Sequence, residues 1–145
     1  MSEYKLKPSV LFWILAIVFV IWNLIGCRMY VMEMTMSDKA YAEAFGSEVA
    51  AVRDVFPVWG LSAYAIAVWS GLLAAILFLL RRRLSALIFP LSLFAAIISF
   101  IPSFVNATLR EAYGPTFWVM PAIVTFIGIV EVIYSRKQAT KGILR

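Results

Sequence analysis

Residues 55–109 read VFPVWGLSAYAIAVWSGLLAAILFLLRRRLSALIFPLSLFAAIISFIPSFVNATL. In this stretch two uncharged runs of 26 residues each flank three consecutive arginines, Arg81 to Arg83. A helix rises about 1.5 Å per residue, so roughly 20 apolar residues cross the hydrocarbon layer of a bilayer. Each run is therefore long enough to cross a membrane, and the arginines between the runs leave room only for a short turn. The stretch predicts two membrane-spanning helices in succession.

Two more uncharged windows, 8–27 and 112–130, extend this pattern along the chain of 145 residues. Of all residues 63% are apolar and only 14% are charged, which is far from the composition of soluble domains. Lipid leaves backbone amides without partners, and the continuous runs lack the alternation of barrel strands. We therefore predict an all-α membrane protein with one membrane domain over 1–145. The domain is a bundle of four transmembrane helices at about 8–30, 57–80, 84–106 and 116–135.

The first window has a second interpretation, as a secretory signal. Basic residues precede its apolar run, and the run ends in Leu24-Ile25-Gly26-Cys27, which resembles a lipoprotein cleavage box. The pair Trp22-Asn23 would be unusual in the apolar core of such a signal, so a retained helix is favoured. Cys27 is then a lone thiol, because a single cysteine cannot form an internal disulfide.

The basic residues divide unevenly between the two sets of helix flanks. One set holds nine, at positions 5, 7, 81–83, 136, 137, 141 and 145, and the other holds Arg28, Lys39, Arg53 and Arg110. The positive-inside rule places the richer set in the cytoplasm. We therefore expect a plasma-membrane protein with both termini cytoplasmic and with loops 28–54 and 106–116 outside. The net charge of +5 then reflects topology and contact with anionic lipid, and nucleic-acid binding is not expected.

The residue types disfavour most catalytic and metal chemistry. The chain has no histidine and one cysteine, which removes the commonest metal ligand, histidine-held haem and serine–histidine catalysis. No nucleophile can be paired with a base, so we expect no enzyme activity and no cofactor or metal.

The first outer loop carries a helical pattern of its own. Five apolar residues recur there at helical spacing: Tyr41, Phe45, Val49, Val52 and Phe56. Ser37 is placed to cap the start of a helix, and Pro57 is placed to end it. We expect an amphipathic helix at about 37–56, whose apolar stripe lies either in the lipid interface or against the bundle.

Two helices have informative faces. The second carries a small residue at every fourth position, which allows close packing either within the bundle or between subunits: Ala63, Ala67, Gly71 and Ala75. The third carries Ser85, Ser92, Ser99 and Asn106 seven residues apart, with Ser103 near the same face. Such a stripe should avoid lipid and face either the bundle or a water-filled path. The alternative to a water-filled path is a structural role, in which the serine hydroxyls form hydrogen bonds to neighbouring helices or to their own backbone. Pro102 is expected to bend this helix.

The first helix supplies Asn23 and, on the same side, Tyr30. Asn23 should face a partner such as the serine stripe. We predict a ligand cavity between Asn23, Tyr30, Ser99, Ser103 and Asn106, with Arg28 and Arg110 above it as groups that face an anion. The only acid inside a predicted crossing is Glu131, which we expect to pair with Arg136 or with the triple arginine.

Several short motifs carry a family resemblance over most of the chain. They are Trp22-Asn23-Leu24-Ile25-Gly26 with Tyr30, Met34-Thr35, Pro57-Val58-Trp59, Ala65-Ile66-Ala67-Val68, the basic turn, and Tyr113-Gly114 with Met120-Pro121. Together they resemble a group of small bacterial membrane proteins often labelled "sugar transporter". The resemblance implies movement of a solute, and it carries over no sugar-binding residue.

Small-solute transport or binding is therefore the predicted function, and the ligand would be a polar or anionic solute. Four helices alone make a thin pore wall, so an oligomer is expected. The alternative is a non-catalytic accessory or scaffold subunit that docks another membrane protein through its small-residue face. A polar cavity would favour transport, whereas a dry bundle with an exposed small-residue groove would favour the accessory role.

Overall fold

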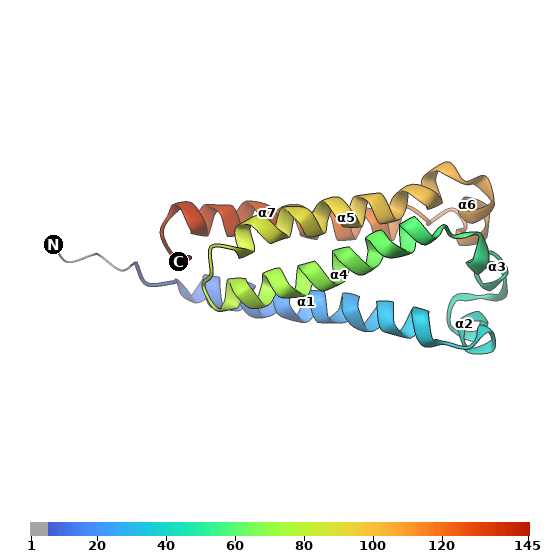
Figure 1. Cartoon of the computed structure of the whole chain (residues 1–145), viewed down its shortest axis with the longest axis horizontal. Coiled ribbons are helices and arrows are strands. Elements are labelled where there is room, and N and C mark those ends of the chain that lie inside the picture. The colour runs from blue at the N-terminus through green and yellow to red at the C-terminus, as the bar shows by residue number, and fades with distance from the viewer. Residues whose placement is uncertain (1–5) are drawn as a thin grey trace.

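Four long helices form the body of the protein. The computed structural model describes residues 6–145, which leaves Lys5 of the basic flank outside, and the elements of the described range are all helical. Those long and apolar enough to cross a membrane are α1 (Val10–Thr35), α4 (Val58–Leu79), α5 (Ser85–Val105) and α7 (Val119–Thr140). They lie lengthwise in one elongated bundle (Figure 1). The predicted all-α membrane fold with four candidate spans is confirmed.

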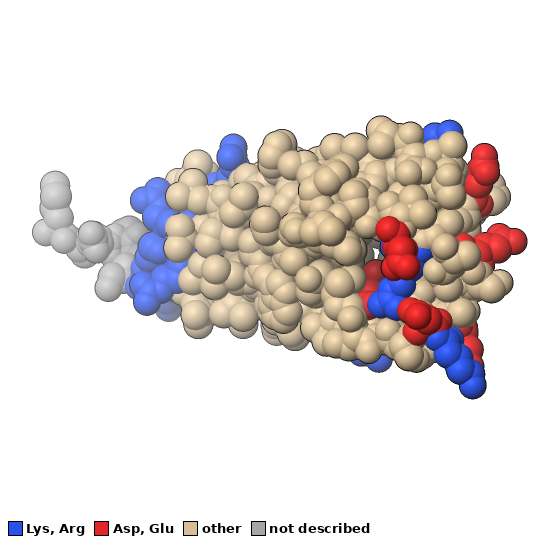
Figure 2. Space-filling view, turned by 45° about the vertical axis from the view of Figure 1, so that its right-hand side comes forward, with Lys and Arg blue, Asp and Glu red and all other residues tan. Residues whose placement is uncertain are grey.

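The two ends of the bundle differ in charge and in structure. One end holds the C-terminus and the turn between α4 and α5, and Figure 2 shows lysine and arginine gathered there. We call it the arginine end. The opposite end, here the loop end, carries the acidic side chains seen in Figure 2 and four short helices. These are α2 (Asp38–Phe45), α3 (Ser47–Ala51), the 3-10 helix η1 (Arg53–Val55) and α6 (Ala107–Tyr113).

The small-residue face of α4 explains how the long helices pack. Helix α4 packs against α1 and, most extensively, against α5, which in turn packs against α7. Ala63, Ala67, Gly71 and Ala75 are all buried in α4. A Cβ atom at Gly71 would overlap Asn23 Oδ1 of α1 and lie 2.8 Å from Ser92 Oγ of α5. The small residues therefore serve contacts within the chain, which decides between the two packing roles left open by the sequence.

The core is uneven along the bundle axis. The half nearer the arginine end holds an aromatic cluster of Phe12, Phe19, Phe78 and Phe89, with ring centroids 4.8 Å apart for Phe12 and Phe78. The cluster nearer the loop end consists of alanines 67, 95 and 96. Helix α7 buries residues only from Glu131 onward. The large aromatic side chains of the core are therefore gathered toward the arginine end, and small side chains form the cluster nearer the loop end.

The helix expected over 37–56 is divided. Helix α2 ends before Gly46, whose φ of 97° lies in the region that favours glycine, and α3 and η1 follow. The predicted cap is confirmed, because Ser37 Oγ accepts a hydrogen bond from Ala40 N at 3.3 Å. Tyr41 is buried, and its ring packs 4.7 Å from that of Phe45. The apolar stripe thus faces the end of the bundle.

The spans contain three prolines, Pro90 and Pro102 inside α5 and Pro121 in the first turn of α7. Pro102 is buried inside α5 and packs on α4, since a Cβ at Gly60 would come within 3.0 Å of Pro102 Cγ. Pro121 is the third residue of α7. In the first turn of a helix proline removes a hydrogen-bond donor that has no partner in any case.

Candidate functional site

A carboxyl and an amide meet inside the bundle. Glu131 of α7 is 4% exposed and Asn23 of α1 is 8% exposed. Asn23 Nδ2 donates to Glu131 Oε1 at 2.7 Å and to the carbonyl oxygen of Phe19 at 2.8 Å. Each residue lies 12 positions from the loop-end terminus of its helix, Thr35 or Val119. At about 1.5 Å per residue this is about 18 Å. Both polar groups therefore lie deep within the candidate membrane spans.

This pair replaces an ion pair that was expected from the sequence. Glu131 was expected to pair with Arg136, but within residues 6–145 it forms no ion pair. Five residues along a helix correspond to a rotation of about 140°, so Arg136 lies on the exposed face of α7 while Glu131 faces inward. Asn23 does lie near the serine stripe, because one Cβ atom at Gly71 would contact both Asn23 and Ser92, but its side-chain partner is Glu131.

The carboxyl keeps capacity for another hydrogen-bond donor. A carboxyl group offers about four acceptor positions, and among the described residues only the Asn23 side chain donates to Glu131. Ionisable groups inside a membrane are costly to bury and commonly mark a pathway for a solute or proton. The glycine at position 71 gives the amide its space, because any larger residue would overlap Asn23 Oδ1.

A row of polar side chains runs from this pair toward the loop end. On α1 the row continues through Cys27, whose Sγ donates to the Val68 carbonyl oxygen at 3.2 Å. Next comes Tyr30, whose ring meets that of Tyr64 edge to face at 5.2 Å between centroids. Tyr64 in turn donates its hydroxyl to Glu33 Oε1 at 3.5 Å. We call this row the polar column: Asn23, Glu131, Cys27, Tyr30, Tyr64 and Glu33.

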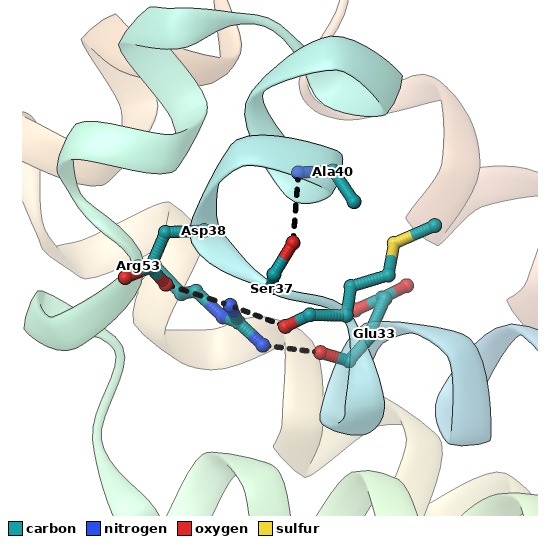
Figure 3. A network of polar contacts seen from close by, with 6 residues as sticks. Glu33, Ser37, Asp38, Ala40 and Arg53 are labelled. Atoms are coloured by element: carbon teal, nitrogen blue, oxygen red, sulfur yellow. Dashed lines mark hydrogen bonds and ion pairs between the residues drawn. The ribbon is translucent and has the colours of Figure 1, made fainter.

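Arg53 fixes the outer loop onto the end of α1. Its Nη2 donates to the Glu33 carbonyl oxygen at 2.5 Å, and its Nη1 donates to the Met36 carbonyl oxygen at 3.2 Å (Figure 3). The same Nη1 lies 3.2 Å from Asp38 Oδ1, and the guanidinium stands 4.5 Å from the Tyr41 ring centroid. Carbonyl groups at a helix C-terminus attract cations. Arg53 therefore holds the loop against the end of the polar column that is formed by Glu33.

Two loop-end tyrosines lie near the same acid. Burial raises the pKa of Tyr113 to about 12, and the nearby Tyr41 and Glu33 add to the rise. Burial and Glu33 also raise the pKa of Tyr41, against the opposing effect of Arg53. Both phenols therefore stay neutral at physiological pH and can donate hydrogen bonds. Figure 2 shows a narrow opening in the surface beside charged side chains of this end.

The serine stripe faces the interior, but its hydroxyls bond to the backbone. Ser92 Oγ donates to the Ala67 carbonyl oxygen of α4 at 2.7 Å, and Ser99 Oγ donates to the Ala96 carbonyl oxygen at 2.6 Å. Ser103 is also buried in α5. These bonds correspond to the structural alternative for the stripe. The hydroxyl hydrogens of Ser92 and Ser99 are therefore already used, whereas the predicted cavity needed serine hydroxyls that could donate to a ligand.

The remaining predicted site residues do not join the polar column. Asn106 caps α6, where its Oδ1 accepts from Thr108 N at 2.9 Å. Arg110 is exposed, and its Nη1 donates to the Phe104 carbonyl oxygen at 2.8 Å. Arg28 lies on the exposed face of α1. The structure thus keeps Asn23 and Tyr30 together and sets the two arginines apart from them, contrary to the expected anion-facing arrangement.

The predicted ligand cavity lacked four members of the column: Glu131, Cys27, Tyr64 and Glu33. The signal for Glu131 was its position as the only acid within a crossing. The groups of the column offer hydrogen bonds and two carboxyl groups, those of Glu131 and Glu33, which suits reversible binding. Within residues 6–145, no three His, Cys, Asp or Glu side chains gather as a metal site would require. No family model, curated protein or solved structure matches the chain.

Proposed function

We propose that this protein binds a small polar solute at Glu131 and Asn23 and carries it across the bacterial inner membrane, as an oligomer. The observation that carries the proposal is the carboxyl–amide pair, buried deep in the bundle with a 2.7 Å hydrogen bond and no basic partner among the described residues. A purely structural bundle gains little from burying a carboxyl group in lipid.

The column favours a solute that donates hydrogen bonds. Glu131 and Glu33 both offer carboxyl oxygens, whereas Arg28 and Arg110 are exposed and lie apart from the column. A neutral polyol or sugar donates through its hydroxyls, and an amine donates with a positive charge as well. An anionic solute would meet carboxyl groups of its own sign. The resemblance to proteins labelled "sugar transporter" agrees with a hydroxyl-rich solute.

The solute enters from the loop end in this proposal. With both termini in the cytoplasm, as the distribution of basic residues indicates, the loop end faces outward. The half of the bundle with the alanine cluster is then the outer half, and the aromatic cluster lies in the inner half.

The accessory role is the weaker candidate. It relied on an exposed small-residue face for docking, and in α4 that face is buried against α1 and α5. Its apolar exposed residues, such as Ile66, Trp69 and Leu73, are those that any lipid-facing helix carries.

A ligand-stabilisation screen tests the proposal. The purified protein is heated with sugars, polyols, amines, amino acids and organic anions, and the unfolding midpoint is measured for each. We expect stabilisation by one class of hydrogen-bond donor, with loss of the effect in Glu131→Gln and Asn23→Ala. Ser62→Ala is the matched control, because Ser62 is an exposed residue of α4 bonded only to its own helix. Indifference to every solute class, or a response that survives Glu131→Gln, would refute the proposal.

A further inference from the structure

The last described residues close the arginine end of the bundle. Gly142, with φ of 72°, turns the chain at the end of α7. Ile143 and Leu144 then insert into the aromatic cluster, where they are 6% and 2% exposed. We call residues 142–145 the strap.

Main-chain hydrogen bonds fix the strap to the turn between α4 and α5. Arg145 N donates to the Arg81 carbonyl oxygen at 2.6 Å, and Arg83 N donates to the Arg145 carbonyl oxygen at 2.8 Å. Arg81 adopts φ of 60°, which is uncommon for a residue other than glycine. Its Nε donates to the Ile143 carbonyl oxygen at 3.0 Å. The turn and the strap thus form one unit whose geometry does not depend on the side chain of Arg145.

This unit surrounds an open cavity of about 440 Å³ lined by Leu80, Arg81, Arg82 and Arg145. The Arg81 guanidinium is engaged by the carbonyl oxygens of Ile143 and Leu6. The side chains of Arg82 and Arg145 are exposed and lack a carboxylate partner, since both ion pairs within the described residues lie at the loop end. Two arginines therefore line one cavity, and neither has an ion-pair partner among residues 6–145.

We propose that this cavity is a phosphate-binding site, with Arg82 and Arg145 as the residues that grip the phosphate group. A guanidinium binds phosphate through two parallel charge-assisted hydrogen bonds. The phosphate comes either from the headgroup of an anionic lipid or from free phosphate. Leu80, 61% exposed at the end of α4, lies where a lipid headgroup would meet the first segment of its acyl chain. The bound anion relieves repulsion between the arginines and stabilises the folded state by mass action.

Charge-matched variants separate a defined site from general attraction to a basic surface. Arg82→Gln, Arg145→Gln and Arg136→Gln each remove one positive charge from the same end of the bundle. Arg136 is exposed on α7 and does not line the cavity. The three variants should share one melting temperature in phosphatidylcholine alone, because no hydrogen bond from the Arg82 or Arg145 side chains supports the described fold.

Binding of phosphatidylglycerol is measured by native mass spectrometry and by thermal stabilisation in phosphatidylcholine nanodiscs. We expect Arg82→Gln and Arg145→Gln each to weaken binding about tenfold, as for loss of one charged contact. Arg136→Gln should weaken it by less than about twofold, in keeping with a solvent-exposed charge. Equal losses in all three variants would overturn the proposal, because they would indicate diffuse attraction.

Inorganic phosphate distinguishes the two sources of the ligand. It is added to the protein in phosphatidylcholine without any anionic lipid, and stabilisation is measured in the same three variants. Stabilisation that is lost in Arg82→Gln supports the site with a soluble ligand. Lipid binding without a phosphate effect supports the site with a headgroup as its ligand. Absence of both responses would overturn the proposal.

Discussion

Gly71→Ala should be the most damaging conservative substitution in the spans. A Cβ atom there would overlap Asn23 Oδ1 and lie 2.8 Å from Ser92 Oγ. Overpacking costs about 1–3 kcal/mol, and displacement of Asn23 from Glu131 costs about 1 kcal/mol more through the lost hydrogen bond. Better helix propensity returns about 1 kcal/mol. The expected loss is therefore about 1–3 kcal/mol in the free energy of unfolding.

Two other glycines provide graded controls for the same chemical change. At Gly26 the added Cβ would lie 3.5 Å from Val68 Cγ1, an ordinary contact, so Gly26→Ala should raise the free energy of unfolding by up to about 1 kcal/mol through its better helix propensity. At Gly128 it would lie 2.7 Å from Leu93 Cδ1, the end of a flexible side chain, so a small cost is expected. Reversible unfolding in mixed detergent micelles measures all three variants.

A double variant tests the cause of the loss. In the Asn23→Ala background the overlapping amide is absent, so Gly71→Ala should cost less there than in the unmodified chain. Such non-additivity is expected of residues in direct contact. If Gly71→Ala unfolds at the same detergent composition as Gly26→Ala, or if its cost is unchanged without Asn23, the proposed packing around the carboxyl–amide pair is refuted.

Three further outcomes are expected. Arg53→Ala should free the 37–56 loop, because three contacts to Glu33, Met36 and Asp38 are lost, and hydrogen exchange there should rise about tenfold or more while the spans remain protected. Cys27, buried and bonded to a backbone carbonyl, should react with a maleimide far more slowly in the folded than in the unfolded protein. Tyr113 has a folded pKa raised to about 12, so its contribution to stability should be complete below pH 10 and lost as the pH rises toward 12. Ultraviolet titration of the protein and of Tyr113→Phe should show this difference, and ionisation of Tyr113 near pH 10 would contradict it.

The spans could be predicted from the sequence because lipid imposes the same demand on every residue of a crossing helix. The absence of charge over about 20 residues is enough to identify such a helix, whatever its neighbours. The short elements were harder. Gly46 indicated a break in the helix of the outer loop, but the helical spacing of apolar residues continued past it. Helix α6 has only seven residues, which is too short for a clear periodic pattern.

The site was predicted less well because partners depend on helix order and rotation. Asn23 and Glu131 are 108 residues apart, and each lies in a span whose inward face the sequence marks only weakly. Arg28 lies about two turns inside α1 and Arg110 lies in the short helix α6, and for each the rotation of the helix decides whether the side chain faces the bundle or the exposed surface. The rule that polar groups face one another was correct for Asn23 but did not identify its partner.

The uneven packing of the bundle has a mechanical consequence. The aromatic cluster and the strap fix the spans to one another at the arginine end, so this end acts as a pivot. Each span extends about 30 Å from the pivot. A tilt of about 5° at the pivot displaces the far end of such a span by about 2–3 Å, while the side chains at the pivot barely move. Motion in this protein should therefore grow steadily with distance from Phe78, and the loop secured by Arg53 should travel farthest.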